Sequence, residues 1–191
     1  MQNEILMAGF GGQGVMTIGK FLAEGALENG LEVAWIPSYG PEMRGGTAYC
    51  TVVVADRPIG SPVVNVPTNI LVMNRPSMAK FASVVKPGGA LIVNSSLIPE
   101  VSGRTDVLQV RVPCNDLSIQ HTGTSRSANI AGLGGSIGAT DMVPVALVEA
   151  FLSRKFKKNQ QVLETNLAIF KAAYQIGAEA RAAWLAGKGG N

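Results

Sequence analysis

Short apolar runs and longer amphipathic segments alternate along the first part of the chain. The run Ile5-Leu6-Met7-Ala8 predicts a strand over residues 4–8. Apolar residues at helical spacing, from Val15 to Leu22, predict a helix over residues 14–29 that ends at Asn29-Gly30. Other short apolar or β-branched runs predict further strands, over residues 31–36, 47–55, 69–73, 90–94 and 105–112.

Helical patterns dominate the second part of the chain. Thr140-Asp141 is expected to cap one helix, with Pro144 in its first turn. Glycines 132, 134 and 135 are expected to break the pitch of the helix before it. The polar stretch 113–127 predicts irregular structure. The helices expected after the first one cover residues 77–85, 127–137, 142–157 and 160–185.

Alternation of strands and helices predicts an α/β fold. No helix separates the second and third strands, so the sheet is expected to be mixed but largely parallel. We expect a single-domain three-layer α/β/α sandwich over residues 1–186, followed by a flexible tail at 187–191.

Composition adds an expectation about surfaces. The chain is 47% apolar and 15% charged, with a mean hydropathy of +0.23, whereas soluble domains are about 25% charged. No apolar stretch approaches the roughly 18–20 residues that span a bilayer, and Gln2-Asn3-Glu4 is not a basic leader. We therefore expect a cytoplasmic protein with large interfaces and no membrane partner, which self-associates when isolated.

Charge, cysteine and histidine content exclude several classes of site. The net charge is +3, but the one dense basic cluster, at 154–158, lies at an expected helix end and lacks stacking aromatics, so no nucleic-acid partner is expected. Cys50 and Cys114 are too few for an iron–sulfur cluster and fit no zinc spacing, so we expect buried thiols and no metal site. His121, the only histidine, lies in a polar stretch, and no catalytic residue can be identified.

A glycine-rich turn, Gly9-Phe10-Gly11-Gly12-Gln13-Gly14, joins the first strand to the first helix. Glycines allow a ligand to approach the backbone closely, and the unpaired N–H groups of the helix attract anions. A P-loop is excluded, because Val15-Met16 follow Gly14. A dinucleotide site would need an acid at the end of the second strand, where Pro37 and Ser38 stand.

Three interpretations of the turn therefore remain open at this point. It holds a phosphate-bearing ligand or a partner backbone, it binds NAD(P) in an independent oxidoreductase, or its glycines only permit tight helix–strand packing in a scaffold.

A second motif, Ser38-Tyr39-Gly40-Pro41-Glu42-Met43-Arg44-Gly45-Gly46-Thr47-Ala48, follows the second strand. In combination with the glycine turn, it resembles the gamma subunit of the 2-oxoacid:ferredoxin oxidoreductases. The 2-oxoglutarate enzyme is closest in look, because its gamma chains carry the Tyr-Gly-Pro-Glu-x-Arg-Gly-Gly form. The resemblance covers essentially the whole chain, including Asn129 and Asn166.

The resemblance implies a subunit of an enzyme that oxidatively decarboxylates a 2-oxoacid with coenzyme A and reduces ferredoxin. Pyruvate, indolepyruvate and branched-chain enzymes contain similar chains. Alpha and beta subunits and, as a further candidate, a delta subunit are the implied partners, with ferredoxin reached through the complex. Thiamine diphosphate, Mg and the iron–sulfur clusters are implied for the other subunits and none for this chain alone, which is expected to be inactive in isolation.

Carried over by motif, a coenzyme A or subunit contact set is expected in both glycine-rich segments. Arg44 could bind a phosphate or carboxylate, or form an ion pair with Glu42 or a partner that orders the loop. Tyr39 could equally be a packing residue. The set is Gly9, Gly11, Gly12, Gln13, Gly14, Tyr39, Glu42, Arg44, Gly45 and Gly46.

Overall fold

A computed structural model describes residues 2–39 and 47–188. Six strands form one sheet in the order β2-β3-β1-β4-β5-β6. β1, β4, β5 and β6 run parallel to one another, and β3 is antiparallel to both β1 and β2. The strands are β1 Gln2–Phe10, β2 Glu32–Tyr39, β3 Thr47–Ala55, β4 Asn69–Val72, β5 Ala90–Asn94 and β6 Leu108–Val112.

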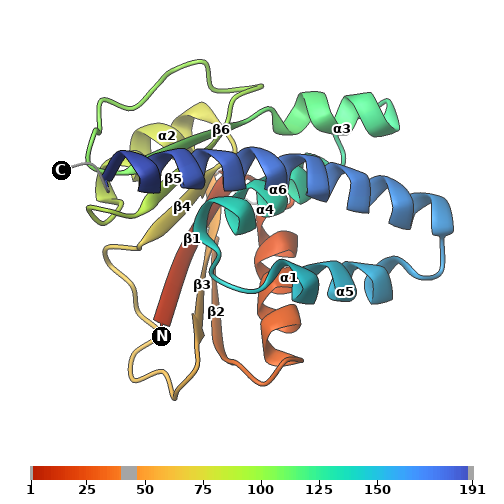
Figure 1. Ribbon diagram of the computed structural model, residues 1–191, viewed down its shortest axis with the longest axis horizontal. Coiled ribbons are helices and arrows are strands. Elements are labelled where there is room, and N and C mark those ends of the chain that lie inside the picture. Colours follow the sequence, from red (N-terminus) through yellow and green to blue (C-terminus); the bar gives the residue numbers. More distant parts are fainter. Residues whose placement is uncertain (1, 40–46, 189–191) are drawn as a thin grey trace.

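Helices cover both faces of this sheet (Figure 1), which confirms the three-layer α/β/α sandwich with a mixed, largely parallel sheet. Successive side chains of a strand point to opposite faces, so Ile5 and Met7 pack with one layer while Leu6 and Ala8 pack with the other. The larger layer contains α1 Val15–Leu27, α4 Ala128–Thr140, α5 Val145–Phe156 and α6 Gln160–Lys188. The smaller contains α2 Arg75–Phe81 and the short 3-10 helix η1 Ala82–Val84.

α4 and α6 cross at very short range because glycines face each other. A Cβ atom on Gly138 would lie 2.1 Å from the Tyr174 carbonyl oxygen, and one on Gly134 would lie 2.3 Å from the Phe170 carbonyl oxygen. From the other helix, a Cβ on Gly177 would lie 2.4 Å from the Gly135 carbonyl oxygen. The expectation that glycines break this helix is wrong: α4 is continuous, since packing against α6 offsets the low helix propensity of glycine.

Two other local expectations also need correction. Asp141 is the C-cap of α4, with a left-handed φ of 51°, and Pro144 is the N-cap of α5, so Thr140-Asp141 does not cap the later helix. The stretch expected to be irregular contains a helix, α3 Cys114–Thr122. Smaller shifts affect element ends: the last strand begins at Leu108 rather than 105, the second strand continues to Tyr39, and α6 continues to Lys188.

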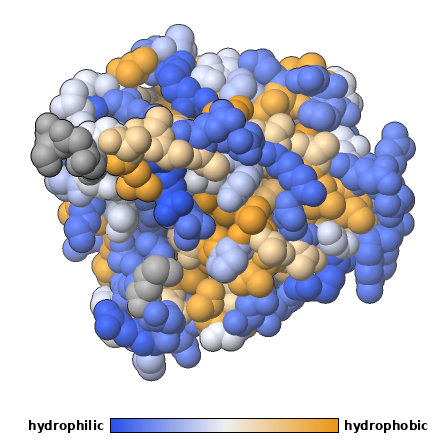
Figure 2. All heavy atoms as spheres, in the orientation of Figure 1, coloured by the Kyte–Doolittle hydropathy of each residue, from blue (hydrophilic) through white to orange (hydrophobic). Residues whose placement is uncertain are grey.

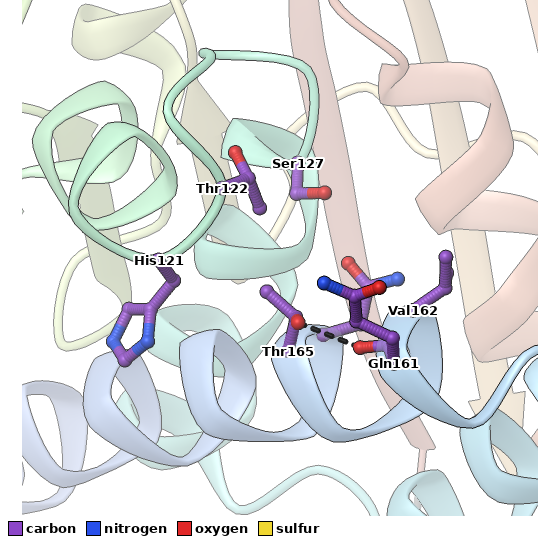
Figure 3. Close-up of a pocket in the computed structure, with 7 residues that line it drawn as sticks. His121, Thr122, Ser127, Gln161, Val162 and Thr165 are labelled. Carbon is purple, nitrogen blue, oxygen red and sulfur yellow. Dashed lines mark hydrogen bonds between the residues drawn. The ribbon is translucent and has the colours of Figure 1, made fainter.

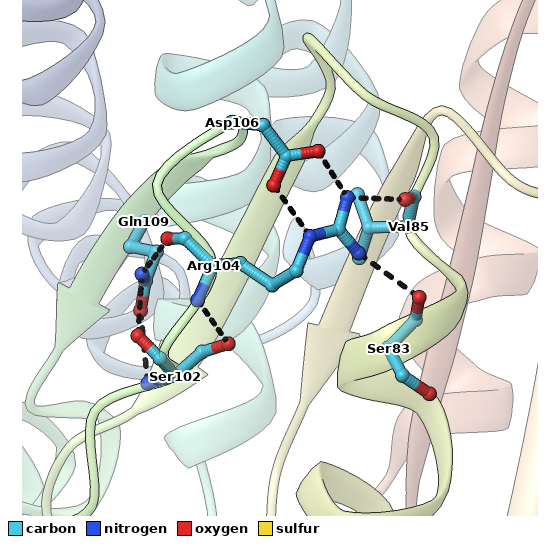
Figure 4. Close-up of polar contacts among 6 residues, drawn as sticks. All are labelled: Ser83, Val85, Ser102, Arg104, Asp106 and Gln109. Atoms are coloured by element: carbon cyan, nitrogen blue, oxygen red, sulfur yellow. Dashed lines mark hydrogen bonds and ion pairs between the residues drawn. The ribbon is translucent and has the colours of Figure 1, made fainter.

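A polar cluster fixes the chain between β5 and β6 (Figure 4). Arg104 donates through Nε and Nη2 to the two carboxylate oxygens of Asp106, at 2.5 and 2.7 Å. Its remaining donors reach the carbonyl oxygens of Ser83 and Val85 at 2.9 and 3.0 Å. The hydrogen bonds from Arg104 lower the pKa of Asp106 below its ordinary value. This segment is thereby tied to the layer that contains η1.

Apolar side chains gather over the middle of the face that carries α4 to α6, with polar side chains around them (Figure 2). Among the residues that the structure describes, no helix has the length and apolar character needed to cross a membrane.

Candidate functional site

The carboxyl ends of the parallel strands meet at one edge of the sheet, and the helices that follow them begin there. α1 leaves β1 and leads back to β2, whereas α2 leaves β4 and leads to β5, so neighbouring strands send their connections in opposite directions. In open α/β sheets, ligands bind in the crevice at such a switch point. The glycine turn occupies this position.

Three glycines of the turn have distinct roles in its geometry. Gly12 and Gly14 adopt left-handed conformations, with φ of 103° and 73°, and Gly14 is the N-cap of α1. A Cβ atom would meet open space at Gly12, but at Gly9 it would lie 2.9 Å from Gln13 Oε1. Gly9 and Gly14 are therefore required for packing, while Gly12 leaves its surface open to an approaching group.

The Gln13 side chain connects the turn to the end of β4. Its Oε1 accepts hydrogen bonds from Phe10 N at 2.7 Å and from Asn74 Nδ2 at 2.8 Å. Its Nε2 donates to the Met73 carbonyl oxygen at 3.2 Å. Asn74 Oδ1 in turn caps α2 by accepting from Ser77 N at 2.9 Å. Gln13, expected as a ligand contact, thus has a structural role in holding the switch point together.

Asn94, the last residue of β5, extends this network to α3. Its Nδ2 donates to the Met73 carbonyl oxygen at 3.3 Å and to Asn115 Oδ1 at 2.9 Å. Its Oδ1 accepts from Cys114 N at 3.2 Å, at the start of α3. Side-chain amides therefore join the carboxyl ends of β1, β4 and β5 to α3 in one continuous set of contacts.

Asn129, in the first turn of α4, supports the turn from the opposite side. Its Nδ2 donates to the Gly14 carbonyl oxygen at 3.4 Å, and a Cβ on Gly14 would lie 2.5 Å from the same nitrogen. The starts of α1 and α4 are thus held side by side, and neither helix has an acidic residue in its first turn. The N-terminus of α1 gives this edge a positive potential.

The second motif starts and ends at the same edge as the glycine turn. Phe10 pairs with Thr47, Gly9 with Ala48, and Ala48 with Tyr39 across three neighbouring strands. Since strands lie about 4.8 Å apart, the Tyr39 backbone is about 10 Å from Gly9. Glu42, Arg44, Gly45 and Gly46 lie outside the described residues, and the expected Arg44 contacts stay predictions.

The strand order gives a further reason against NAD(P) binding at the glycine turn, and this order could not be read from the sequence. In the nucleotide-binding arrangement, the acid that holds the ribose stands at the end of the strand beside β1. Here the antiparallel strand β3 lies between β1 and β2. The network at the switch point consists of the carboxamides of Gln13, Asn74, Asn94 and Asn115, which bind by hydrogen bonds and repel neither a phosphate nor a carboxylate.

Both cysteines are free and buried, as expected. Burial raises the pKa of the Cys50 thiol to about 12 and also raises that of Cys114. Two thiols do not fit an iron–sulfur cluster, which takes four, and the described part of the chain has no group of three or more potential metal ligands. His121 is exposed near the end of α3, as expected for a surface histidine.

Sequence reasoning missed Asn74 and Asn94 as parts of this site. A signal was present, since each asparagine directly follows an apolar run, Ile70–Met73 or Leu91–Val93. Polar residues at the ends of buried parallel strands gather at one edge of the sheet, and this rule could have identified both.

A scan of family models gives a match over residues 4–176 to the family described as pyruvate ferredoxin/flavodoxin oxidoreductase. The chain belongs to this family. The matched range includes the amide network, from Gln13 to Asn115, and both glycine-rich segments of this chain.

Curated relatives carry two different substrate names. The ketoisovalerate oxidoreductase subunit VorA of Methanothermobacter marburgensis is 35% identical to this chain over 170 residues. The aligned residues cover 88% of this chain but only 35% of VorA. The 2-oxoglutarate synthase subunit KorC of Methanocaldococcus jannaschii is 31% identical over 185 residues, covering 94% of this chain and 96% of the relative. The family member therefore spans about a third of the first relative and nearly all of the second.

Solved structures agree on the fold. The gamma subunit of a keto/oxoacid ferredoxin oxidoreductase from Geobacter sulfurreducens matches with a TM-score of 0.78 at 26% identity, covering 96% of this chain and 98% of that one. A 2-oxoglutarate:ferredoxin oxidoreductase from Magnetococcus marinus, with 2-oxoglutarate, coenzyme A and succinyl-CoA bound, matches at 0.84 and 23% identity, covering 93% and 31%. The latter likeness is one of fold.

Proposed function

We propose that this chain is the gamma subunit of a multi-subunit 2-oxoacid:ferredoxin oxidoreductase, acting on 2-oxoglutarate, and that its carboxyl edge forms one wall of the coenzyme A site. One observation carries the proposal. The glycine turn and both ends of the second motif lie at the same switch point, in register through Gly9, Ala48 and Tyr39.

The chemistry of this edge suits a phosphate-bearing co-substrate. The N-terminus of α1 provides N–H donors, amides provide neutral hydrogen-bonding groups, and Gly12 allows close approach. Nothing in the described site offers a nucleophile or a paired acid and base, so this wall binds and orients while the reacting groups belong to other subunits.

We assign the cofactors, like the reacting groups, to the other subunits. Thiamine diphosphate and the iron–sulfur clusters supply decarboxylation and electron transfer when bound in the complex. The buried, widely separated thiols of this chain do not fit a cluster. Alpha and beta subunits are the proposed neighbours. Exposed apolar side chains suit such interfaces: Val63, Val66, Val101 and Leu185 are 54% exposed or more.

A pair of glycine substitutions in the assembled enzyme tests the coenzyme A wall. Gly12 and Gly30 both have positive φ, 103° and 77°, and both have open space at the Cβ position. Gly12→Ala and Gly30→Ala therefore impose similar backbone strain, but only Gly12 lies at the proposed site. We expect Gly12→Ala to raise the KM for coenzyme A about fivefold or more, with Gly30→Ala unchanged. Equal KM values would favour a scaffold without a ligand pocket.

A dinucleotide titration tests the rival enzyme class. Saturable micromolar binding of NADH to the purified chain would favour an independent NAD(P)-dependent oxidoreductase, and we expect none. Substrate identity is tested by comparing 2-oxoglutarate, pyruvate and ketoisovalerate with the complete enzyme. The proposal requires 2-oxoglutarate to have the highest kcat/KM of the three.

A further inference from the structure

A second concave region lies where the end of α3, the start of α4 and the first half of α6 meet (Figure 3). This hollow has a volume of about 270 Å³ and is lined mainly by hydroxyl, amide and imidazole side chains. Its main polar residues are His121, Thr122, Ser127, Gln161, Thr165 and Asn166.

Asn166 gives the strongest indication that a ligand belongs here. The residue is only 6% exposed, and its Oδ1 atom is buried without a hydrogen-bond partner. Leaving a buried acceptor unsatisfied costs about 1–3 kcal/mol, and buried polar groups in folded proteins nearly always have partners. A hydrogen-bond donor that enters the hollow would satisfy this atom.

The threonine hydroxyl protons around Asn166 are already used, which limits what the hollow still offers. Thr165 donates to the Gln161 carbonyl oxygen at 2.6 Å, and the Thr122 hydroxyl lies 2.8 Å from the carbonyl oxygens of Ser118 and Thr124. The Gln161 amide and the His121 ring contribute both donors and acceptors. The hollow therefore presents a mixture of donors and acceptors.

Formal charge is missing from the described lining, since no Lys, Arg, Asp or Glu is among the described residues that form it. A charged ligand group would lose its hydration without an ionic partner in return. A neutral group with both N–H and C=O, which is an amide, matches the lining better. Val162 and the threonine methyl groups add an apolar surface for the chain that carries the amide.

The start of α4 contributes residues both to the hollow and to the candidate site. Ser127 lines the hollow, and Asn129, two residues later, holds the Gly14 carbonyl oxygen. We propose that the hollow binds an uncharged amide-bearing chain, specifically the pantetheine arm of a coenzyme A ligand whose phosphates lie at the glycine turn. This inference rests on the proposed function and assigns a place to the part of the co-substrate that carries no charge.

The two halves of the ligand can be tested separately on the full chain. Pantetheine contains both amides and no phosphate, whereas ADP contains the diphosphate and no carboxamide. With side-chain amide signals followed by NMR, pantetheine is expected to shift those of Asn166 and Gln161, and ADP those of backbone groups in residues 9–14. Pantetheine that leaves the Asn166 and Gln161 signals unmoved overturns the inference.

Adjacent glutamines on α6 provide a matched control. Gln161 lines the hollow, while Gln160 donates to Glu164 Oε1 at 2.7 Å and does not line it. Gln161→Leu is expected to weaken pantetheine binding about fivefold, the equivalent of one neutral hydrogen bond, and Gln160→Leu to leave it unchanged. Equal effects would overturn the inference, and Gln161 is exposed, so neither variant threatens folding.

Asn166→Leu separates this inference from the proposed function. Replacing a buried amide whose oxygen has no partner by a similar apolar side chain should leave the fold intact, as thermal unfolding will show. In the assembled enzyme it is expected to raise the KM for coenzyme A about tenfold at constant KM for the 2-oxoacid. If Gly12→Ala raises that KM and Asn166→Leu does not, the coenzyme A wall stands and the pantetheine assignment falls.

Discussion

Asn74 donates a hydrogen bond from Nδ2 to Gln13 Oε1 at 2.8 Å, across 61 residues of sequence. The contact joins a turn after β1 to the cap of α2, at the point where the sheet's connections diverge. Gln13 Oε1 also accepts a hydrogen bond from Phe10 N, and Gln13 Nε2 donates to the Met73 carbonyl oxygen. Together these contacts hold the backbone beneath the candidate site in a fixed position.

Removing the Gln13 amide is expected to destabilise the protein through unpaired partners. Gln13→Leu leaves Phe10 N and Asn74 Nδ2 without their acceptor in a half-buried site, so we expect the free energy of unfolding to fall by about 2–3 kcal/mol. Gln13→Glu keeps the acceptor for Phe10 N and Asn74 Nδ2 but places a carboxylate oxygen against the Met73 carbonyl oxygen. Its free energy of unfolding should therefore fall by less than that of Gln13→Leu. Urea unfolding measures both. As a control, Gln175→Leu alters an exposed hydrogen bond to Glu179 and should cost little.

Alanine at three glycines should separate backbone strain from steric clash. Gly14→Ala combines positive φ with a Cβ only 2.5 Å from Asn129 Nδ2, Gly12→Ala has positive φ and open space, and Gly103→Ala has open space and no such φ. We expect losses of about 3, about 1 and about 0 kcal/mol in that order. Adding Asn129→Ala to Gly14→Ala should recover part of the loss. A double variant no more stable than Gly14→Ala would contradict the assigned clash.

The α4–α6 crossing makes a sharper claim about packing. In Gly138→Ala, the new Cβ would lie 2.1 Å from the Tyr174 carbonyl oxygen and 2.8 Å from Ala178 N, both backbone atoms that cannot rotate away. We expect the free energy of unfolding to fall by about 3 kcal/mol or more, because the helices must separate. A melting temperature within a degree or two of the parent would show that the helices are not packed this closely.

Alkaline pH should weaken the fold through its buried thiols. The pKa of Cys50 is about 12 in the folded protein and about 8.5 in an unfolded chain. The resulting stability is fully present below about pH 8.5 and is lost as pH rises toward 12, because only the unfolded state ionises readily. Between pH 9 and 10.5, the free energy of unfolding of the parent protein should fall more steeply with pH than that of Cys50→Ala, by about 1.4 kcal/mol per pH unit. Parallel slopes would contradict the burial of this thiol.

Local sequence signals predicted most of the fold, whereas contacts between distant residues decided the rest. The glycine turn was predictable because strand, glycines and helix are adjacent in sequence. The helix at Cys114–Thr122 was not, because its residues show no apolar periodicity, and Asn94 and the neighbouring helices hold it. The unbroken α4 likewise depends on α6, which begins twenty residues after α4 ends, and local helix propensity does not include that contact.

Part of the candidate site could likewise be predicted from local motifs, and part depends on contacts between distant residues. Motifs identified the turn and residues 38–48, and pairing through Gly9, Ala48 and Tyr39 then brought their described ends to one edge. The Gln13 contacts could not be predicted, since they depend on which strand lies beside β1. One side of the hollow at Asn166 is formed by α3, the helix that the sequence pattern did not indicate.

Co-purification of the chain from its native cells tests whether it is a subunit of a 2-oxoacid-oxidising complex. With an affinity tag on this chain, we expect alpha and beta subunits to elute with it, in a fraction that reduces a viologen dye only when both 2-oxoglutarate and coenzyme A are present. A chain that elutes without other subunits, in a fraction with no reduction dependent on both a 2-oxoacid and coenzyme A, would contradict the account.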